Sequence, residues 1–94
     1  MAEKTKKSRP IVVGKKPVAN YALAIASRIG EGETQIILRA RGKLIGVAFD
    51  AANMAINMNQ PVKRGKVRWG QESAPGGNGK MVSFVEIELI GKEV

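Results

Sequence analysis

The stretch Val13-Gly14-Lys15-Lys16-Pro17-Val18 joins a short apolar run to an amphipathic segment. The run Ile11-Val12-Val13 is rich in β-branched residues and is closed by Gly14, which is typical of a buried strand. Pro17 suits the first turn of a helix, where its missing N–H costs nothing. The stretch therefore predicts a strand, a tight turn that presents two cations, and a helix.

The segment after Pro17 is expected to be a helix that ends at Gly30, since glycine readily takes the conformation of a helix stop. Spacings of four, three and four residues give it one apolar stripe, made of Val18, Ala22, Ile25 and Ile29. A second strand is expected at Gln35–Leu38. The basic stretch Arg39-Ala40-Arg41-Gly42-Lys43 closes that strand and opens a second helix over residues 44–57.

The second helix carries two apolar stripes. The first contains Leu44, Ala48, Ala51, Ala55 and Met58, and the second contains Ile45, Phe49, Ala52 and Ile56. A helix packed on one side needs a single stripe, so the second stripe favours a partner surface. The alternative is a helix tucked deeply into its own sheet.

Two long strands, Val62–Gly70 and Lys80–Ile90, are expected to form a hairpin with a glycine-rich tip at residues 74–79. Strict alternation along the first strand places Arg64, Lys66 and Arg68 on one face, and Lys63, Val67 and Trp69 on the other. In the second strand, Glu86 and Glu88 are expected on a solvated face or opposite the basic row. A core or dimer-interface role is favoured for Trp69 over stacking on a base.

The order of elements is β-α-β-α-β-β. It predicts an α/β (α+β) two-layer sandwich: a mixed four-stranded sheet, two helices on one face and a long hairpin arm. Because strand–helix–strand units need crossovers, the first three strands are expected to run parallel and the last antiparallel to its neighbour. Residues 11–94 form one domain, and residues 1–10 are read as a disordered basic arm.

The charge balance points to a polyanionic partner. The 94 residues contain 16 Lys and Arg against 8 Asp and Glu, a formal net charge of +8. Such an excess suits nucleic acid, an acidic membrane surface or an acidic protein. It also suits a basic protein whose charge only keeps it dispersed.

The residue types exclude several classes of function. Cysteine and histidine are absent, which rules out disulfides and the usual zinc sites and fits an intracellular, cytoplasmic protein. The charged N-terminus lacks the apolar core of a secretory signal, and no run is long enough for a membrane span. Without histidine or a tuned carboxylate pair, an enzyme is not expected, and neither is a cofactor. Gly14-Lys15-Lys16 also lacks the spacing of a phosphate-cradling nucleotide loop.

Positive charge gathers in three places. Lys15 and Lys16 occupy the first turn, and Arg39, Arg41 and Lys43 flank the second strand–helix junction. Both groups follow parallel strands, so they are expected at one edge of the sheet. The third group lies along the hairpin and extends the patch as an arm: Lys63, Arg64, Lys66, Arg68 and Lys80. A basic patch with arms predicts recognition of duplex phosphates and shape, with little sequence preference.

Two motifs resemble the archaeal Alba chromatin proteins. One is Ile11-Val12-Val13-Gly14-Lys15-Lys16-Pro17-Val18-Ala19-Asn20-Tyr21, and the other is Ile37-Leu38-Arg39-Ala40-Arg41-Gly42-Lys43-Leu44-Ile45 with Asp50 after it. The resemblance runs from about Ile11 to Leu89. It implies a two-layer fold, a homodimer with two hairpin arms, and a chromosomal protein of the nucleoid that binds double-stranded DNA and often RNA.

The resemblance also implies roles for individual residues. The lysine of the Gly-Lys-Lys-Pro turn, here Lys16, is implied as a DNA contact and an acetylation target, and acetylation would weaken phosphate binding. The expected nucleic-acid contacts are Lys15, Lys16, Asn20, Arg39, Arg41 and Lys43. The basic residues of the hairpin, Arg64, Lys66, Arg68 and Lys80, are also expected contacts, but the resemblance carries them over only as a region. The expected dimer interface contains Ile45, Phe49, Ala52, Ile56 and Phe84.

One departure from the family pattern lies near the end of the second helix. Many members carry there a phenylalanine that helps dimers stack along DNA, and Asn59 takes its place here. An amide forfeits most of that apolar contact, which predicts weaker contacts between dimers and allows pairing with a paralogue.

Three functions remain open from the sequence. The first is an architectural protein that coats or compacts duplex DNA as a dimer, the second is an RNA-binding protein or ribonucleoprotein subunit using the same surface, and the third is a scaffold for acidic proteins. Charge alone does not separate DNA from structured RNA, because both offer arrays of phosphates.

Overall fold

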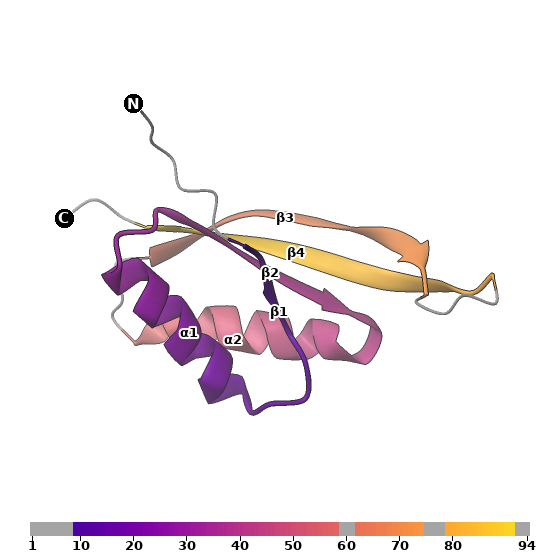
Figure 1. Ribbon diagram of the computed structural model, residues 1–94, viewed down its shortest axis with the longest axis horizontal. Helices are drawn as coiled ribbons and strands as arrows, with labels where there is room; N and C mark the ends of the chain where they lie inside the picture. The colour runs from indigo at the N-terminus through magenta and orange to yellow at the C-terminus, as the bar shows by residue number, and fades with distance from the viewer. Residues whose placement is uncertain (1–8, 59–61, 75–78, 92–94) are drawn as a thin grey trace.

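The computed structural model describes residues 9–58, 62–74 and 79–91, which form one four-stranded sheet with both helices on one face (Figure 1). In chain order the elements are β1 (Ile11–Val12), α1 (Val18–Gly30), β2 (Gln35–Arg41), the 3-10 helix η1 (Gly42–Leu44), α2 (Ile45–Asn57), β3 (Val62–Ser73) and β4 (Met81–Gly91). The predicted two-layer class and the order of elements are confirmed.

The last strand of the chain lies inside the sheet, whose order is β1-β2-β4-β3. β1 pairs with β2 in parallel, and β4 runs antiparallel to both β2 and β3. β1, β2 and β3 therefore share one direction, as the crossover connections predicted. Directly paired residues project to the same side of a sheet, so Leu38 and Ile87 face the helices while Arg39 and Glu86 occupy the opposite side. We call that opposite side the open face.

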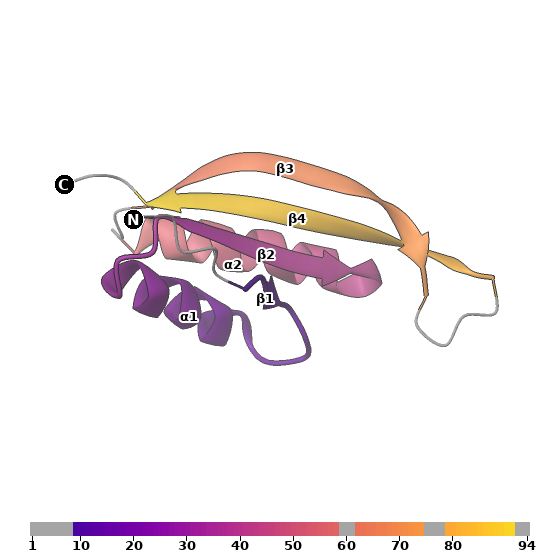
Figure 2. The ribbon, with the colours of Figure 1, turned by 45° about the horizontal axis from the view of Figure 1, so that its top comes forward.

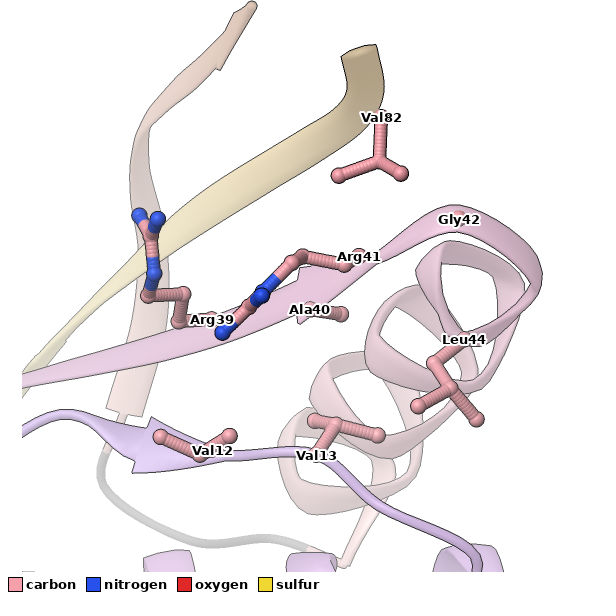
Figure 3. Close-up of a pocket in the computed structure, with 8 residues that line it drawn as sticks. All are labelled: Val12, Val13, Arg39, Ala40, Arg41, Gly42, Leu44 and Val82. Carbon is pink, nitrogen blue, oxygen red and sulfur yellow. The ribbon is translucent and has the colours of Figure 1, made fainter. Parts of the chain in front are cut away.

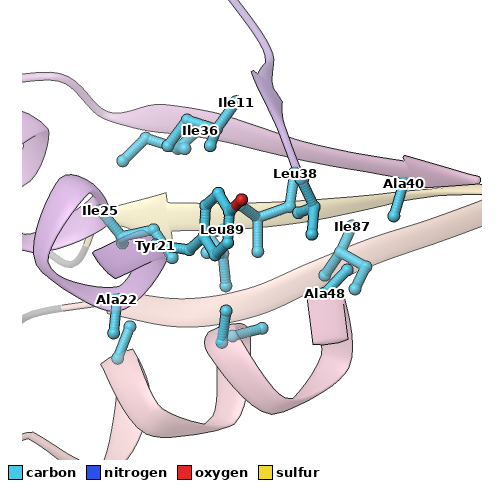
Figure 4. Packing of buried hydrophobic residues seen from close by; sticks show 14 of the residues in the cluster. Ile11, Tyr21, Ala22, Ile25, Ile36, Leu38, Ala40, Ala48, Ile87 and Leu89 are labelled. Carbon is cyan, nitrogen blue, oxygen red and sulfur yellow. The ribbon is translucent and has the colours of Figure 1, made fainter. Parts of the chain in front are cut away.

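The core fills the space between the sheet and the helices (Figure 4). Alternate residues of β2 and β4 supply its floor: Ile36, Leu38, Ala40, Val85, Ile87 and Leu89. The helices supply Tyr21, Ala22, Ile25, Ala48, Ala51, Ala52 and Ala55. The buried residues of α2 are all alanines, and such small side chains let a helix backbone approach its neighbours closely.

Burial separates the two stripes predicted on α2 only in part. Ala48, Ala51 and Ala55 of the first stripe are buried, but so is Ala52 of the second. Ile45, Phe49 and Ile56 pack against the rim of the core and stay partly exposed. Met58, expected with the first stripe, is 39% exposed because it follows the last turn of α2.

β3 contains a bulge at Gly65 and Lys66. Arg64 and Val67 pair with successive core residues of β4, so Gly65 and Lys66 together lie opposite Glu88. The carboxylate of Glu88 accepts a hydrogen bond from the Lys66 backbone N–H at 3.0 Å. A Cβ on Gly65 would lie 2.5 Å from Glu88 Oε1, which explains glycine at this position.

The bulge overturns the predicted faces of β3. Arg64 projects toward the helix side and Arg68 toward the open face, because strict alternation fails where two residues oppose one. Val67 and Trp69 both lie on the helix side, whereas Lys63 projects to the open face. The prediction that Arg64, Lys66 and Arg68 share a face is therefore wrong.

Several element ends differ from the predictions. α1 ends at Gly30, but the left-handed residue that reverses the chain is Gly32, at φ 94°. Pro17 lies just before the first helical residue. β2 continues to Arg41 and β3 to Ser73, so the hairpin is longer than expected and extends the molecule to 47 × 32 × 19 Å. Neither α1 nor α2 has the length and apolar character needed to cross a membrane.

Some predictions concern residues outside the described ranges. These are most of the N-terminal arm (residues 1–8), the position of Asn59 and the hairpin tip at residues 75–78. At the edge of the described chain, the backbone carbonyl of Arg9 accepts a hydrogen bond from Arg28 Nη1 at 2.5 Å.

Candidate nucleic-acid interface

Basic residues from separate parts of the chain lie on one side of the helical layer and along the hairpin. The β1–α1 turn lies near the middle of both ribbon views and the β2–η1 junction lies to its right, both on the side of the helices that is nearer the hairpin arm (Figures 1 and 2). Lys15 and Lys16 in the first turn and Lys43 in η1 are exposed. Asn20, in the first turn of α1, is exposed as well. The parallel course of β1 and β2 accounts for this arrangement, since both strands end at the same edge.

The side chain of Tyr21 anchors the lysine turn, which is residues Gly14–Lys16. The Tyr21 hydroxyl accepts hydrogen bonds from the backbone N–H groups of Gly14 at 2.7 Å and of Lys16 at 3.3 Å. The tyrosine itself is only 7% exposed. These two N–H groups already have a partner, so they do not form a free anion-binding nest. The lysine side chains are therefore the groups of this turn that can bind a phosphate.

Replacing Tyr21 with phenylalanine tests this anchor. The ring keeps its place in the core, but two backbone N–H groups lose their acceptor, which costs about 1–2 kcal/mol of unfolding free energy. We expect faster amide exchange at Gly14 and Lys16 and about threefold weaker binding to duplex DNA. Unchanged exchange at both amides, measured by NMR, would show that the hydroxyl does not order the turn.

The arginines of β2 are paired with carboxylates on the open face. Arg39 binds Glu72 through Nη2 and Glu86 through Nη1, the latter at 2.5 Å. Arg41 Nε lies 3.1 Å from Glu72 Oε2. Glu86 also accepts hydrogen bonds from Arg68 Nε and Nη2, at 3.0 and 2.8 Å. We call these five residues the arginine–carboxylate network.

Phe84 lies inside this network and not on a surface near α2. The guanidinium carbon of Arg39 lies 4.8 Å from the centre of the Phe84 ring, and that of Arg68 lies 5.6 Å from it. Gly70, paired opposite, leaves room for the ring at its side. Cation–π attraction therefore adds to the ion pairs that join β2, β4 and β3. Phe84 projects to the open face, so it does not share a surface with Ile45, Phe49 and Ile56.

Contacts on the open face shift the pKa values of Arg39, Glu86 and Glu88. Burial would raise the pKa of Glu86, but the hydrogen bonds from Arg68 and Arg39 outweigh it and lower that pKa. Burial would likewise lower the pKa of Arg39, and the hydrogen bonds to Glu72 and Glu86 raise it instead. The backbone N–H of Lys66, followed by the Gln35 side chain, lowers the pKa of Glu88.

These shifts predict a loss of stability in acid. A carboxylate whose pKa is lower in the folded state stabilises the fold above its unfolded pKa, and that contribution disappears as the pH falls through the folded value. The unfolded value for glutamate is about 4.3. We expect Tm to fall between about pH 5 and pH 3, and to fall less steeply in Glu86→Gln. Equal pH profiles for the two proteins, measured by thermal melting, would contradict this assignment.

The remaining basic residues of the hairpin are spread over both sheet faces. Lys63, Arg64, Lys66 and Lys80 are exposed, as is Arg68 despite its ion pair. Arg64 lies on the helix side and Lys63 on the open face, so the arm presents charge in two directions. Such a distribution suits a ribbon surrounded by phosphates better than a single contact face.

A hollow of about 430 Å³ opens beside Arg39 and Arg41, where β1 ends before β2 does (Figure 3). Its lining is mostly apolar: Val12, Val13, Arg39, Ala40, Arg41, Gly42, Leu44 and Val82. The lining contains no acidic residue. Among the described residues, no group of three or more acidic, histidine or cysteine side chains could hold a metal ion.

A separate apolar surface lies on the helix side of the hairpin. Trp69 is 70% exposed, Met81 55% and Val67 36%. The core role considered for Trp69 is therefore wrong: Trp69 pairs with the buried Val85, but it belongs to the edge strand β3 and stays uncovered there. Ala52 is fully buried and offers no surface. Of the predicted dimer interface on α2, the partly exposed Ile45, Phe49 and Ile56 could still contact a partner.

Sequence reasoning missed two features of this region. The anchoring role of Tyr21 went unnoticed, although its position four residues after Pro17 places it one helical turn from the lysine turn. The pairing of Glu72 with β2 was also missed. No local signal reveals it, because β3 and β2 are not neighbours in the sheet.

Comparisons with known proteins agree with this architecture. No protein-family model matches the chain. The DNA/RNA-binding protein Alba of Thermoplasma volcanium is 38% identical over 81 residues, which cover 84% of this chain and 91% of the relative. The solved structure of Alba from Thermoplasma volcanium superposes with a TM-score of 0.79 at 35% identity, covering 87% of this chain and 99% of that one.

A more distant structure shares the fold alone. It is ALBA1 from Trypanosoma brucei, with a TM-score of 0.74 at 18% identity, covering 89% of this chain and 69% of that one. The identity and coverage of the Thermoplasma relative, together with the shared fold, decide the family. The chain belongs to the Alba family.

Proposed function

We propose that this protein is a homodimeric chromosomal protein that binds double-stranded DNA with little sequence preference and coats or compacts it. The observation that carries the proposal is the exposed lysine turn, bonded to Tyr21, on the side of the helices that is nearer η1 with Lys43 and the basic arm. Lysines on a rigid turn supply charge to a phosphate backbone without reading bases. Acetylation of Lys16 would remove one of these charges and lower the affinity.

The exposed apolar surface supports the proposed dimer. Trp69, Met81 and Val67 on the arm and the partly exposed stripe of α2 all lie on the helix side of the sheet. A large exposed aromatic residue surrounded by other apolar side chains is typical of a protein interface. Two arms and two lysine turns on one dimer would double the number of phosphate contacts.

RNA is the second candidate ligand. The relative from Thermoplasma volcanium is named a DNA/RNA-binding protein, and exposed lysines would bind the phosphates of either nucleic acid without contacting a particular sugar. Among the described residues, Phe84 is the aromatic residue of the open face, and Arg39 and Arg68 flank its ring, so this face lacks a row of stacking rings. This favours duplex or structured RNA over single strands as the alternative ligand.

Binding across a range of salt concentrations tests the proposal. Release of six or more counterions predicts a slope of log K against log [salt] of about −5 on duplex DNA. Competition between random-sequence duplex DNA and a structured RNA of equal length then ranks the two ligands. A flat salt response would rule out the phosphate model, and binding to acidic proteins would become the better hypothesis.

A further inference from the structure

Glu72 makes an unusual connection across the sheet. It belongs to β3, yet its carboxylate binds two arginines of β2, which is separated from β3 by β4. Strands in a sheet lie about 4.8 Å apart, so this contact spans about 10 Å of sheet. Glu72 bridges this distance over the open face, with Oε1 on Arg39 Nη2 and Oε2 3.1 Å from Arg41 Nε.

The two arginines are not held equally. Arg39 has a second carboxylate partner in Glu86 and a ring partner in Phe84, and its side chain is 23% exposed. Arg41 has Glu72 as its ion-pair partner among the described residues, and its side chain is 41% exposed. Arg41 can therefore exchange its partner at a much smaller cost than Arg39.

A phosphate would use the same donors as Glu72. Arginine N–H groups bind carboxylate and phosphate oxygens in similar geometry, so the two anions compete for one guanidinium. Glu72 is tethered by the fold, which gives it a high effective concentration beside Arg41. An isolated anion in solution competes poorly with such a partner. A polyanion already bound at Lys15 and Lys16 presents further phosphates nearby and competes well.

We propose that Glu72 is an internal competitor that occupies Arg41 in the free protein and sets the affinity of this surface for phosphate backbones. The inference rests on the proposed function, because it concerns the same nucleic-acid surface. Glu72 lowers the affinity for every anion, but most strongly for isolated ones. It therefore makes the protein selective for closely spaced phosphates, and it limits how tightly the protein holds its nucleic acid.

The test compares Glu72→Gln with Glu31→Gln. Both variants remove one negative charge, but Glu31 is exposed beyond the end of α1 and has no ion pair among the described residues. We expect Glu72→Gln to bind a random duplex about fivefold more tightly than the Glu31→Gln control, with a salt slope steeper by about one. Equal affinities of the two variants, or weaker binding by Glu72→Gln, would overturn the proposal.

A double-mutant cycle separates competition for Arg41 from a general charge effect. In an Arg41→Gln background, the gain from Glu72→Gln should shrink to that from Glu31→Gln, because the contested donor is gone. An undiminished gain would overturn the proposal. Thermal melting of each variant confirms that the compared proteins are folded.

The same measurements distinguish this proposal from the proposed function. If the unmodified protein shows no salt-dependent binding to duplex DNA or structured RNA, the proposed function fails, and the role of Glu72 fails with it. If the unmodified protein binds and the two glutamine variants behave alike, only the role of Glu72 is overturned.

Discussion

Replacing Trp69 with lysine is expected to separate the proposed dimer into monomers and to weaken binding to duplex DNA by about a hundredfold, because two linked sites bind far more tightly than one. Trp69 is 70% exposed within one chain, so its removal should leave the fold of that chain intact. The substitution adds a positive charge. Electrostatics alone would therefore tighten binding, and a loss of affinity must have another cause.

The matched control is Leu23→Lys. Leu23 is 58% exposed on α1 and belongs to neither the arm nor the apolar stripe of α2. The Leu23→Lys variant loses an apolar side chain and gains the same charge as Trp69→Lys. It is expected to keep the oligomeric state of the unmodified protein and to bind DNA at least as tightly. Sedimentation gives the oligomeric state, and fluorescence anisotropy with labelled duplex gives the affinity.

The result for Trp69 also separates its two remaining roles. Monomers with weak binding indicate a residue of the dimer interface. Dimers with weak binding indicate that the indole stacks on the nucleic acid. Dimers with unchanged or tighter binding would show that Trp69 serves neither purpose, and the proposed dimer surface would be wrong.

Replacing both Lys15 and Lys16 with alanine is the second large expected effect. The proposed dimer would lose four cations, so affinity for all duplex sequences should fall by about 10- to 100-fold and the salt slope should become shallower by about 3 to 4. Both lysines are exposed, and no ion pair within the described residues involves them. Tm should therefore change little.

The conservative variant controls for the shape of the turn. Lys15→Arg with Lys16→Arg keeps both charges on the same backbone, so its affinity and salt slope should stay close to those of the unmodified protein. Lys16→Gln alone imitates the loss of charge on acetylation and should produce part of the alanine effect. A drop in Tm without a drop in affinity would mean that the lysines are structural.

The lysine turn was predictable because its determinants are local. Gly14 and Pro17 mark the strand end and the helix start, and the lysines lie between them. The buried face of β4 was equally predictable, since alternate apolar residues such as Val85 and Ile87 identify it in the sequence. Parallel crossovers then placed the two basic turns at one edge of the sheet.

The features that escaped prediction depend on contacts between distant segments. Alternation assigned Arg64 and Arg68 to one face, but the bulge opposite Glu88 separates them. The exposure of Trp69 follows from the place of β3 at the edge of the sheet, which the sequence of β3 does not specify. The ion pair between Glu72 and Arg41 joins β3 to β2 across β4, so it depends on a strand order that neither segment specifies.

The interior position of β4 also has a consequence for folding kinetics. Arg39 and its partner Glu86 are 47 residues apart, so the pairing of β2 with β4 closes a long loop. The β3–β4 hairpin is local and can form before this pairing. Folds dominated by such non-local pairs fold in milliseconds to seconds, and their intermediates expose apolar strand faces that aggregate. The net charge of +8 keeps such intermediates apart by mutual repulsion. A polyanion present during refolding would neutralise that repulsion. The nucleic acid that the folded protein is proposed to bind is therefore expected to promote aggregation of its folding intermediates.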